Sequence, residues 1–390
     1  MYVKNLIRLF FDLIRPFSYY RGSKFIFQQT RNILRTCTVS ILGSFTQMKI
    51  AQIAPIIERV PPKRYGGTER VVYALTEELV RRGHDVTLFA SGDSVTSAQL
   101  VSVYPKALRE AKLKDPYGLN VWTLLSIGDA YARQDEFDII HDHNSHISLP
   151  VANIAHTPVV MTIHGPLIPE VRRIFRALKN PYLVSISNAQ RDPAPDLHYA
   201  ANVYNGLAMR QYPFSDKHDG YLLFVGRISL EKGVHLAIEA AQQLDLPLII
   251  AAKLEPTDRP YFQEYVEPFL SDQIKWIGEV NEEERNKLMS RAMCFLHPVT
   301  WAEPFGLTLI EAMACGCPVV AIGRGSIPEI VRNKRTGFVV RDLEGMLDAI
   351  QNIGMIERKR CRRYALQHFS AEKMAAGYEA VYQKILNKEI

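Results

Sequence analysis

Apolar residues recur along the chain in two patterns from residue 48 onward. Short runs rich in β-branched residues, such as FDIIHDH and PVVMTIHG, alternate with longer stretches that carry an apolar residue at every third or fourth position, such as GTERVVYALTEELVRRG. Continuous apolar runs are typical of parallel strands covered on both faces, and the longer spacing is typical of amphipathic helices. The alternation therefore predicts strand–helix–strand units around a parallel sheet.

A passage rich in Pro, Gly and Asp, NVYNGLAMRQYPFSDKHDG, divides this alternation into two series. With 390 residues, the chain is long enough for two domains with separate cores. We predict two doubly wound α/β domains, over residues 48–210 and 211–370. The pattern of residues 371–390 predicts a C-terminal helix. Whether this helix packs back on the first domain stays open. Because ligands bind beyond the carboxyl ends of parallel strands, the two domains should face each other across one deep cleft.

The first 47 residues carry seven Lys or Arg and one acid, so acids and Lys/Arg are equal in number over the rest of the chain. That balance argues against a nucleic-acid-binding protein. Apolar stretches such as LIRLFFDLI are compatible with a basic amphipathic helix that makes a peripheral contact with an anionic membrane face. The alternative, which we favour, is a poorly ordered extension or an upstream start codon, because MKIAQIAPI from Met48 has the pattern of a first strand.

The five cysteines are scattered, and three of them lie in the apolar runs MCFLHPV and ACGCPVVA. There a thiol acts as a small apolar group, which suits a reducing compartment. No apolar run is long enough to span a membrane and no signal-peptide pattern is present, so we expect a cytoplasmic protein. Cys315 and Cys317 lack the second pair of ligands that a zinc site needs.

Two glycines, Gly66 and Gly67, follow the first predicted strand and precede a helix in PPKRYGGTER, with Thr68 as the predicted N-cap. Paired glycines at a helix N-terminus allow backbone N–H groups to approach an anion, and the helix dipole favours a phosphate there. A tight strand-to-helix turn explains the same residues, so both interpretations stay open.

Arg227 and Lys232 lie five residues apart on a loop after a predicted strand, in FVGRISLEKGVHLAIEA. Two cations on such a loop can hold a diphosphate and stabilise the charge that builds on a departing phosphate. Neither the Rossmann GxGxxG nor the Walker GxxxxGKS/T pattern follows a strand, which weighs against dinucleotide and P-loop chemistry.

Glu303 and Glu311 stand on either side of a glycine turn in EPFGLTLIE, where a helix is predicted to begin near Leu307. We expect Gly306 to make the turn, the N–H groups from Phe305 to Leu307 to face the cleft, and Glu311 to fall in the first helical turn. The two carboxylates would then bracket an anion site and accept hydrogen bonds from pairs of hydroxyls. A nucleotide-sugar has such pairs on its ribose and on its sugar, with a diphosphate between them.

Together, YGGTE, VGRISLEKG and EPFGLTLIEAMACGCPVVA resemble the retaining glycosyltransferases of family 4, over about residues 48–387. The resemblance implies the GT-B fold, in which two Rossmann-like domains bind the acceptor and the nucleotide-sugar donor respectively. It implies that Glu303 contacts the transferred sugar and Glu311 the ribose. Arg227 and Lys232 would hold the diphosphate, helped by N–H groups at Gly67 and the Gly306 turn.

The same resemblance places Gly278 and Val280 of WIGEV beside the base, and His164 of TIHG near the donor sugar. It also implies that neither a catalytic metal nor a cofactor is needed. The histidines of HDHNSH are therefore interpreted as structural or cleft-lining rather than as metal ligands; these are His141, His143 and His146.

A resemblance to retaining enzymes implies that a hexose is transferred with retention at its anomeric carbon. Because no second carboxylate is evident as a nucleophile, we hypothesise a front-face route in which the leaving diphosphate takes the acceptor proton. Its catalytic residues would be His164, Arg227, Lys232 and Glu303. UDP-glucose is the expected donor, and GDP-sugars and other UDP-sugars stay open. A small molecule, a lipid and a polysaccharide precursor all stay open as acceptors. Two alternatives stay open as well: a GT-B UDP-sugar epimerase, and a nucleotide-sugar-binding protein without catalysis.

Overall fold

The computed structural model describes residues 47–64, 66–111, 113, 115 and 117–390. Our interpretations of residues 1–47 therefore concern a segment that, apart from Gln47, lies outside the described residues. Residues Met48–Ile390 form one compact unit that contains two parallel β-sheets.

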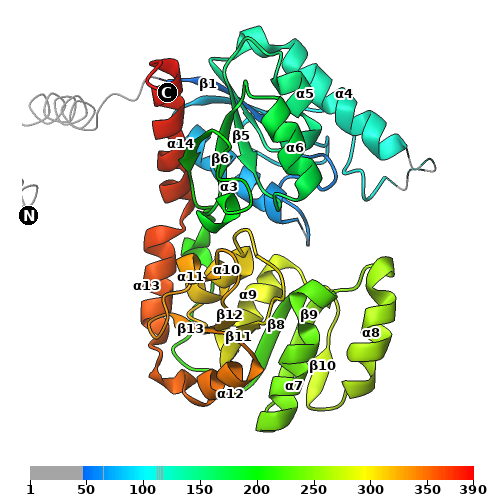
Figure 1. The fold of residues 1–390 in the computed structure, drawn as a ribbon, viewed down its shortest axis with the longest axis vertical. Helices are drawn as coiled ribbons and strands as arrows, with labels where there is room; N and C mark the ends of the chain where they lie inside the picture. Colours follow the sequence, from blue (N-terminus) through cyan, green and yellow to red (C-terminus); the bar gives the residue numbers. More distant parts are fainter. Residues whose placement is uncertain (1–46, 65, 112, 114, 116) are drawn as a thin grey trace, which may run out of the picture. The chain divides into compact units, whose positions relative to one another are not determined.

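The first sheet has seven strands in the order β3-β2-β1-β4-β5-β6-β7 (Figure 1). All of its neighbouring strands run parallel. The strand order reverses between β1 and β4, so the loops after these two strands diverge and leave a crevice at the carboxyl edge of the sheet. The strands are β1 (Lys49–Ile53), β2 (Asp85–Phe89), β3 (Gln99–Val101), β4 (Ile139–Asp142), β5 (Val159–Ile163), β6 (Tyr182–Ser185) and β7 (Tyr199–Asn202).

Helices cover both faces of this sheet, which is why its strands read as continuous apolar runs. Ile50 packs in one core with Leu75 of α3, whereas its neighbour Ala51 packs in another core with Ile127 of α4. We call this sheet and the helices between its strands the first half. Its helices are α3 (Gly67–Arg81), α4 (Gly118–Ala132), α5 (Leu149–Ala152) and α6 (Pro169–Ala177), with the 3-10 turns η2 (Gln134–Glu136), η3 (Ser145–Ile147) and η4 (Ala189–Arg191).

The second sheet has six parallel strands in the order β10-β9-β8-β11-β12-β13, and its order reverses between β8 and β11. We call this sheet and its helices the second half. Its strands are β8 (Leu222–Arg227), β9 (Leu248–Lys253), β10 (Ile274–Trp276), β11 (Cys294–His297), β12 (Val319–Ile322) and β13 (Gly337–Val340). Its helices are α7 (Val234–Leu244), α8 (Arg259–Tyr265), α9 (Glu282–Arg291), α10 (Leu307–Ala314), α11 (Ile327–Ile330) and α12 (Leu343–Gln351), with 3-10 turns η5 (Met209–Gln211), η6 (Leu230–Lys232), η7 (Pro256–Asp258), η8 (Glu267–Phe269) and η9 (Ile353–Met355).

The prediction of two doubly wound parallel sheets is confirmed. The predicted N-cap of α3 is wrong. The N-cap is Gly66 rather than Thr68, because the helix begins at Gly67.

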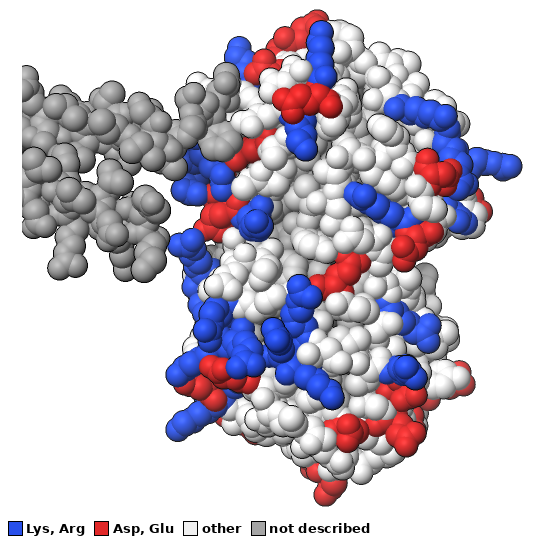
Figure 2. Space-filling model, turned by 60° about the vertical axis from the view of Figure 1, so that its left-hand side comes forward, with Lys and Arg blue, Asp and Glu red and all other residues white. Residues whose placement is uncertain are grey.

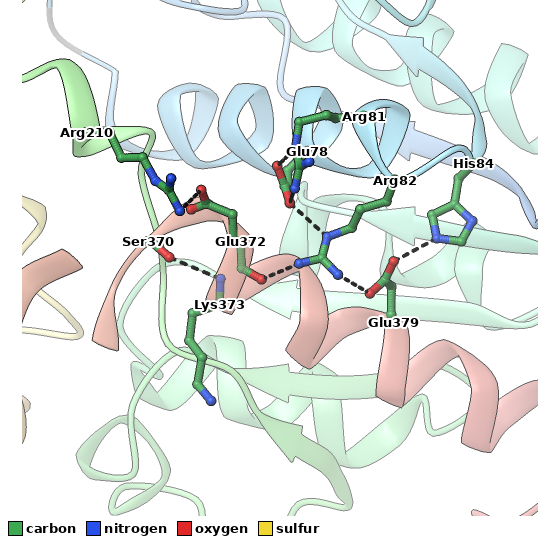
Figure 3. A network of polar contacts seen from close by, with 9 residues as sticks. All are labelled: Glu78, Arg81, Arg82, His84, Arg210, Ser370, Glu372, Lys373 and Glu379. Atoms are coloured by element: carbon green, nitrogen blue, oxygen red, sulfur yellow. Dashed lines mark hydrogen bonds and ion pairs between the residues drawn. The ribbon is translucent and has the colours of Figure 1, made fainter. Parts of the chain in front are cut away.

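The chain ends in two helices, α13 (Arg358–His368) and α14 (Ala371–Leu386). The first packs against α10 of the second half, and the second packs against α3 of the first half (Figure 1). Arg82, next to the end of α3, donates to Glu379 at 2.8 Å and to the backbone oxygen of Glu372 at 2.8 Å (Figure 3). His84 lies 2.9 Å from the other Glu379 oxygen. The C-terminal helix is therefore attached to the first half by buried and partly buried polar contacts.

The surface carries mixed charges, with basic side chains gathered in one area of the face drawn in Figure 2. Lys359 of α13 is exposed and is paired with Asp216 at 3.1 Å. The Arg332 guanidinium lies over the ring of Tyr364, which belongs to the same helix α13. Among the described residues, no helix combines the length and the apolar character that crossing a membrane requires.

Replacing Glu379 should destabilise the fold, because Glu379→Ala removes the carboxylate that both Arg82 and His84 contact, while Arg82 keeps only Glu78, at 2.8 Å, as a carboxylate partner among the described residues. We expect a loss of about 2 kcal/mol in the free energy of unfolding, the usual order for losing a hydrogen bond to a charged group, and a melting temperature lower by several degrees. Glu372→Ala is the matched control on the same helix, because Arg82 binds the Glu372 backbone oxygen, and the Glu372 side chain pairs with the exposed Arg210. Equal melting temperatures for the two variants would show that the pair does not anchor α14.

Candidate active site

The predicted chemistry gathers at the carboxyl ends of strands that lie at or next to the two strand-order reversals. In the second sheet, Arg227 ends β8 and His297 ends β11. In the first sheet, the loop after β1 leads to Gly66, and His164 directly follows β5. Side chains and backbone from both halves line one cleft of about 490 Å³. The topology thus brings together residues that are far apart in the sequence.

Lys232 and Glu303 form the centre of the second half's contribution to the cleft. Lys232 Nζ lies 2.7 Å from Glu303 Oε2, and Trp301 Nε1 donates to the same oxygen at 3.1 Å. The ammonium group also lies 4.9 Å from the centre of the Trp301 ring. Burial alone would raise the pKa of Glu303, but His297 and the Lys232 charge lower that pKa to about 2. Glu303 is therefore an anion whose carboxylate is held in a fixed orientation.

Two glycines are required for this arrangement. Gly306 caps α10 with φ 83°, and a Cβ there would lie 2.7 Å from Leu309 Cδ1. Gly233 follows Lys232 with φ 71°, and a Cβ there would lie 2.0 Å from the backbone oxygen of Pro298. Both positions need left-handed backbone and close approach, which only glycine permits. The turns that present Glu303 and Lys232 therefore depend on glycine.

Arg227 also lies in the cleft, where acids already surround it. Its guanidinium pairs with Glu231 of η6, and its Nε lies 3.4 Å from Asp258 Oδ2. Arg227 is the last residue of strand β8 rather than a loop residue, and Lys232 ends the 3-10 turn η6 five residues later.

Glu311 is more deeply placed than the sequence indicates. It is the fifth residue of α10, so the prediction that it lies in the first turn is wrong. Its side chain is fully buried and its Oε1 pairs with Arg70 of α3 and, at 2.9 Å, with Arg285 of α9. Its Oε2 has no hydrogen-bond partner among the described residues. One carboxylate oxygen thus remains able to accept a hydrogen bond from a ligand.

The N-termini of α3 and α10 approach each other across the cleft. A Cβ on Gly67 would lie 3.5 Å from Leu307 Cδ1, and both residues line the cleft together with Gly66, Phe305 and Gly306. Because both helix ends point unpaired N–H groups and the positive end of a dipole toward the same space, the arrangement is suited to an anion.

Three further predicted residues have different positions relative to the cleft. His164 and Val280 line it, whereas Gly278 does not, although it lies in the turn that leads to Val280 with φ 77°. His143 is buried behind His164, and His146 is exposed. In the part of the chain that the structure describes, no three His, Cys, Asp or Glu residues are placed to hold a metal ion.

Comparison with known families identifies both parts of this cleft. A model described as Glycosyltransferase Family 4 matches residues 65–192, and one described as Glycosyl transferases group 1 matches residues 208–367. The two ranges take up most of the chain and contain most of the cleft residues of both halves. The chain belongs to the family 4 glycosyltransferases.

Relatives and solved structures agree with this assignment. A glycogen synthase of Mycobacterium tuberculosis is 27% identical over 75% of this chain and 83% of its own length. A sucrose-phosphate synthase from Thermosynechococcus elongatus has a TM-score of 0.73 at 19% identity, covering 88% of this chain and 100% of that chain. The Anabaena protein HepE, solved with UDP-glucose, has a TM-score of 0.66 at 19% identity, covering 87% and 100%. At these identities the structures show that the glycosyltransferase has the GT-B fold.

Several residues of the glycosyltransferase cleft were missed from the sequence. Arg70 and Arg285, the partners of Glu311, are separated from it by long stretches of chain, and nothing in their local sequence marks them. Glu69 could have been found from the sequence, because YGGTE places an acid shortly after the glycine pair at the start of a helix. It is buried in the cleft wall. Burial, reinforced by the nearby Glu58 carboxylate, raises the pKa of Glu69 to about 7.

The raised pKa of Glu69 makes the stability of the glycosyltransferase depend on pH. The folded state holds the Glu69 proton more tightly than the unfolded chain, whose carboxyl has a pKa of about 4.3. The stabilisation is therefore complete below that value and is lost as the pH rises through about 7.

We expect Glu69→Gln, which cannot ionise, to melt at nearly the wild-type temperature at pH 5 and several degrees above it at pH 8. Glu283→Gln, at an exposed position on α9, is the control and should shift equally at both pH values. A constant difference between Glu69→Gln and the wild type would contradict the raised pKa.

Proposed function

We propose that this enzyme transfers a hexose, with retention, from a nucleotide-diphosphate sugar to a hydroxyl acceptor. The observation that carries the proposal is the Lys232–Glu303 pair beside the glycine turn of α10. It places a cation, a fixed carboxylate and a helix N-terminus at one point of the cleft. A diphosphate bonded to a polyhydroxyl group offers the complementary charges and hydrogen-bond donors.

The donor would lie along the second half's wall of the cleft. Its diphosphate meets the facing N-termini of α3 and α10 together with Arg227 and Lys232. Its ribose reaches the unpartnered Oε2 of Glu311, and its base lies near Val280 and the Gly278 turn. We propose UDP-glucose as the donor, supported by the likeness to HepE, whose structure contains that nucleotide-sugar.

The charge state of Glu303 favours the front-face route over a covalent intermediate. A carboxylate whose pKa is about 2 and which is held by Lys232 and Trp301 is a weak base and a weak nucleophile. Its role in the proposal is to orient the sugar together with His164. The bond from C1 to the diphosphate breaks as the bond from C1 to the acceptor oxygen forms, and the acceptor proton passes to the leaving phosphate oxygen.

In this route, side chains stabilise the leaving group. Arg227 and Lys232 supply fixed positive charge where the negative charge develops. We therefore propose that the reaction uses no metal and no cofactor beyond the donor itself.

The acceptor would enter from the first half, and its class stays open among small molecules, lipids and polysaccharide precursors. We propose a cytoplasmic enzyme, in keeping with Cys294, Cys315, Cys317 and Cys361, which are all free thiols buried in the described structure. Peripheral membrane contact through residues 1–47 stays a prediction.

Donor identity can be tested by thermal stabilisation with a panel of nucleotide-sugars, because a ligand that binds only the folded state raises its melting temperature. UDP-glucose should give the largest shift. Glu311→Gln should reduce that shift strongly and should also lower the melting temperature without ligand, because Arg70 and Arg285 lose their paired carboxylate. Glu283→Gln, on the exposed side of α9, should keep the full shift. If no nucleotide-sugar stabilises the wild type, the proposal fails at its first step.

Lys232 can be tested by separating catalysis from binding. With UDP-glucose and an acceptor extract, Lys232→Ala should lower kcat by about 100-fold to 1000-fold, as for other single groups that stabilise developing charge, while KM for the donor changes little. Lys275→Ala, at an exposed position on β10, is the control. An unchanged kcat would remove Lys232 from the mechanism. Product formation without any acceptor would favour an epimerase, and binding without turnover a non-catalytic protein.

A further inference from the structure

A continuous chain of buried polar groups runs from the cleft to the C-terminal helix. It begins at His164 in the cleft wall and passes through His143, Gln52 and His141 to Tyr382 of α14. Gln52 and His141 face each other on the neighbouring strands β1 and β4. All but His164 are buried, so each polar atom must find its partner within the protein.

Alternation along the strands puts these side chains on one face. His141 and His143 are two residues apart, as are Thr162 and His164, so each pair points the same way from adjacent strand ends. The His141 and His143 rings lie 4.1 Å apart, and those of His143 and His164 lie 5.1 Å apart. Helix α14 closes this face, because His141 Nε2 lies 2.7 Å from Thr162 Oγ1, which in turn lies 2.8 Å from Tyr378 Oη.

The three histidines are neutral near pH 7. Burial lowers the pKa of His141 and His143 well below the ordinary value, and it lowers that of His164 to about 4. A neutral imidazole has one N–H donor and one acceptor nitrogen, so the partner of one nitrogen decides the role of the other.

Gln52 decides the direction of the hydrogen bonds. Its Oε1 lies 2.8 Å from His143 Nε2 and can only accept, so that nitrogen carries the proton. His143 Nδ1 is then an acceptor, and it lies 2.8 Å from His164 Nε2, which must donate. The Gln52 amide nitrogen faces the other way, 3.4 Å from Tyr382 Oη. Turning the amide over would reverse the direction and protonate His164 on Nδ1 instead.

We propose that Gln52 and His143 are positioning residues that hold His164 as the Nε2–H tautomer, with Nδ1 as its hydrogen-bond acceptor. A histidine in this state can accept a hydrogen bond from a sugar hydroxyl but cannot donate one from Nδ1. The assignment of a sugar as its partner rests on the proposed function, whereas the tautomer follows from the orientation of the Gln52 amide.

The tautomer can be measured without any substrate. Nitrogen-15 labelled histidine in the full chain gives two-bond proton–nitrogen correlation spectra in which the two neutral tautomers differ, and the His164→Gln variant identifies the signal. We expect His164 to be protonated on Nε2 at pH 7.5. Protonation on Nδ1, or an equal mixture of tautomers, would overturn the proposal.

A variant then tests the role of Gln52. Gln52→Met keeps the length of the side chain but removes the acceptor, so the His164 signal should change to a mixture of tautomers. With sugar transfer as the assay, kcat should fall about 10-fold and the donor KM less than about 2-fold. Gln243→Met on the exposed face of α7 is the control. An unchanged tautomer and unchanged kcat in folded Gln52→Met would contradict the proposal.

The two arms also separate this inference from the proposed function. If the wild type shows the Nε2–H tautomer and Gln52→Met disturbs it, the positioning role stands even when no nucleotide-sugar is turned over. If transfer is observed but His164 is protonated on Nδ1, the function stands and the positioning role fails.

Discussion

The fully buried carboxylate of Glu311 is the constraint on which the geometry of the cleft depends. Taking a charged group out of water costs several kcal/mol. The groups that pair with it must supply stabilisation of about the same size. Here the partners are guanidinium groups from two other helices, Arg70 of α3 and Arg285 of α9. Burial opposes the charge on Arg70, yet the Glu311 carboxylate raises the pKa of Arg70 above its ordinary value. The beginning of α10, and with it the glycine turn and Glu303, can occupy only the position in which these charges meet.

The same cluster links the two halves. Arg70 stands four residues after the Gly66 cap of α3, so its contact with Glu311 also fixes the first half's glycine pair opposite α10. Glu329 of α11 adds a second link, because it accepts from the backbone N–H groups of Asn188 and Ala189 at the start of η4. The cleft therefore has walls from different sheets, but their spacing is fixed by charged contacts rather than by the apolar cores alone.

Sequence patterns predicted the two sheets and most helix positions because burial on both faces imposes long apolar runs, and glycine turns mark the strand ends. They also predicted that Arg227, Lys232 and Glu303 lie in the same cleft, since all three stand at or after the ends of strands. The sequence patterns did not predict features that depend on which residues come close together in the folded chain. Arg70 and Arg285 carry no local mark of their pairing with Glu311, and the value to which the pKa of Glu69 is raised comes from burial. The beginning of α3 was misplaced because Gly66, with positive φ, caps the helix without a side-chain hydrogen bond.

The packing of α14 affects how the first half folds while the chain is still being synthesised. Tyr378 and Tyr382 fill the core beside β1, β4 and β5, strands that precede them by more than 200 residues (~330 from Gln52). Because ribosomes add roughly 5–20 residues per second, the first half waits tens of seconds, open on one face, before its last piece emerges. Gln52 and the three histidines form a polar patch on that face, next to apolar residues such as Ile50. This patch is hydrated during that time, whereas a face of exposed leucines alone would be prone to aggregation. The polar patch thus suits a half that is completed only when residues 371–386 have been made.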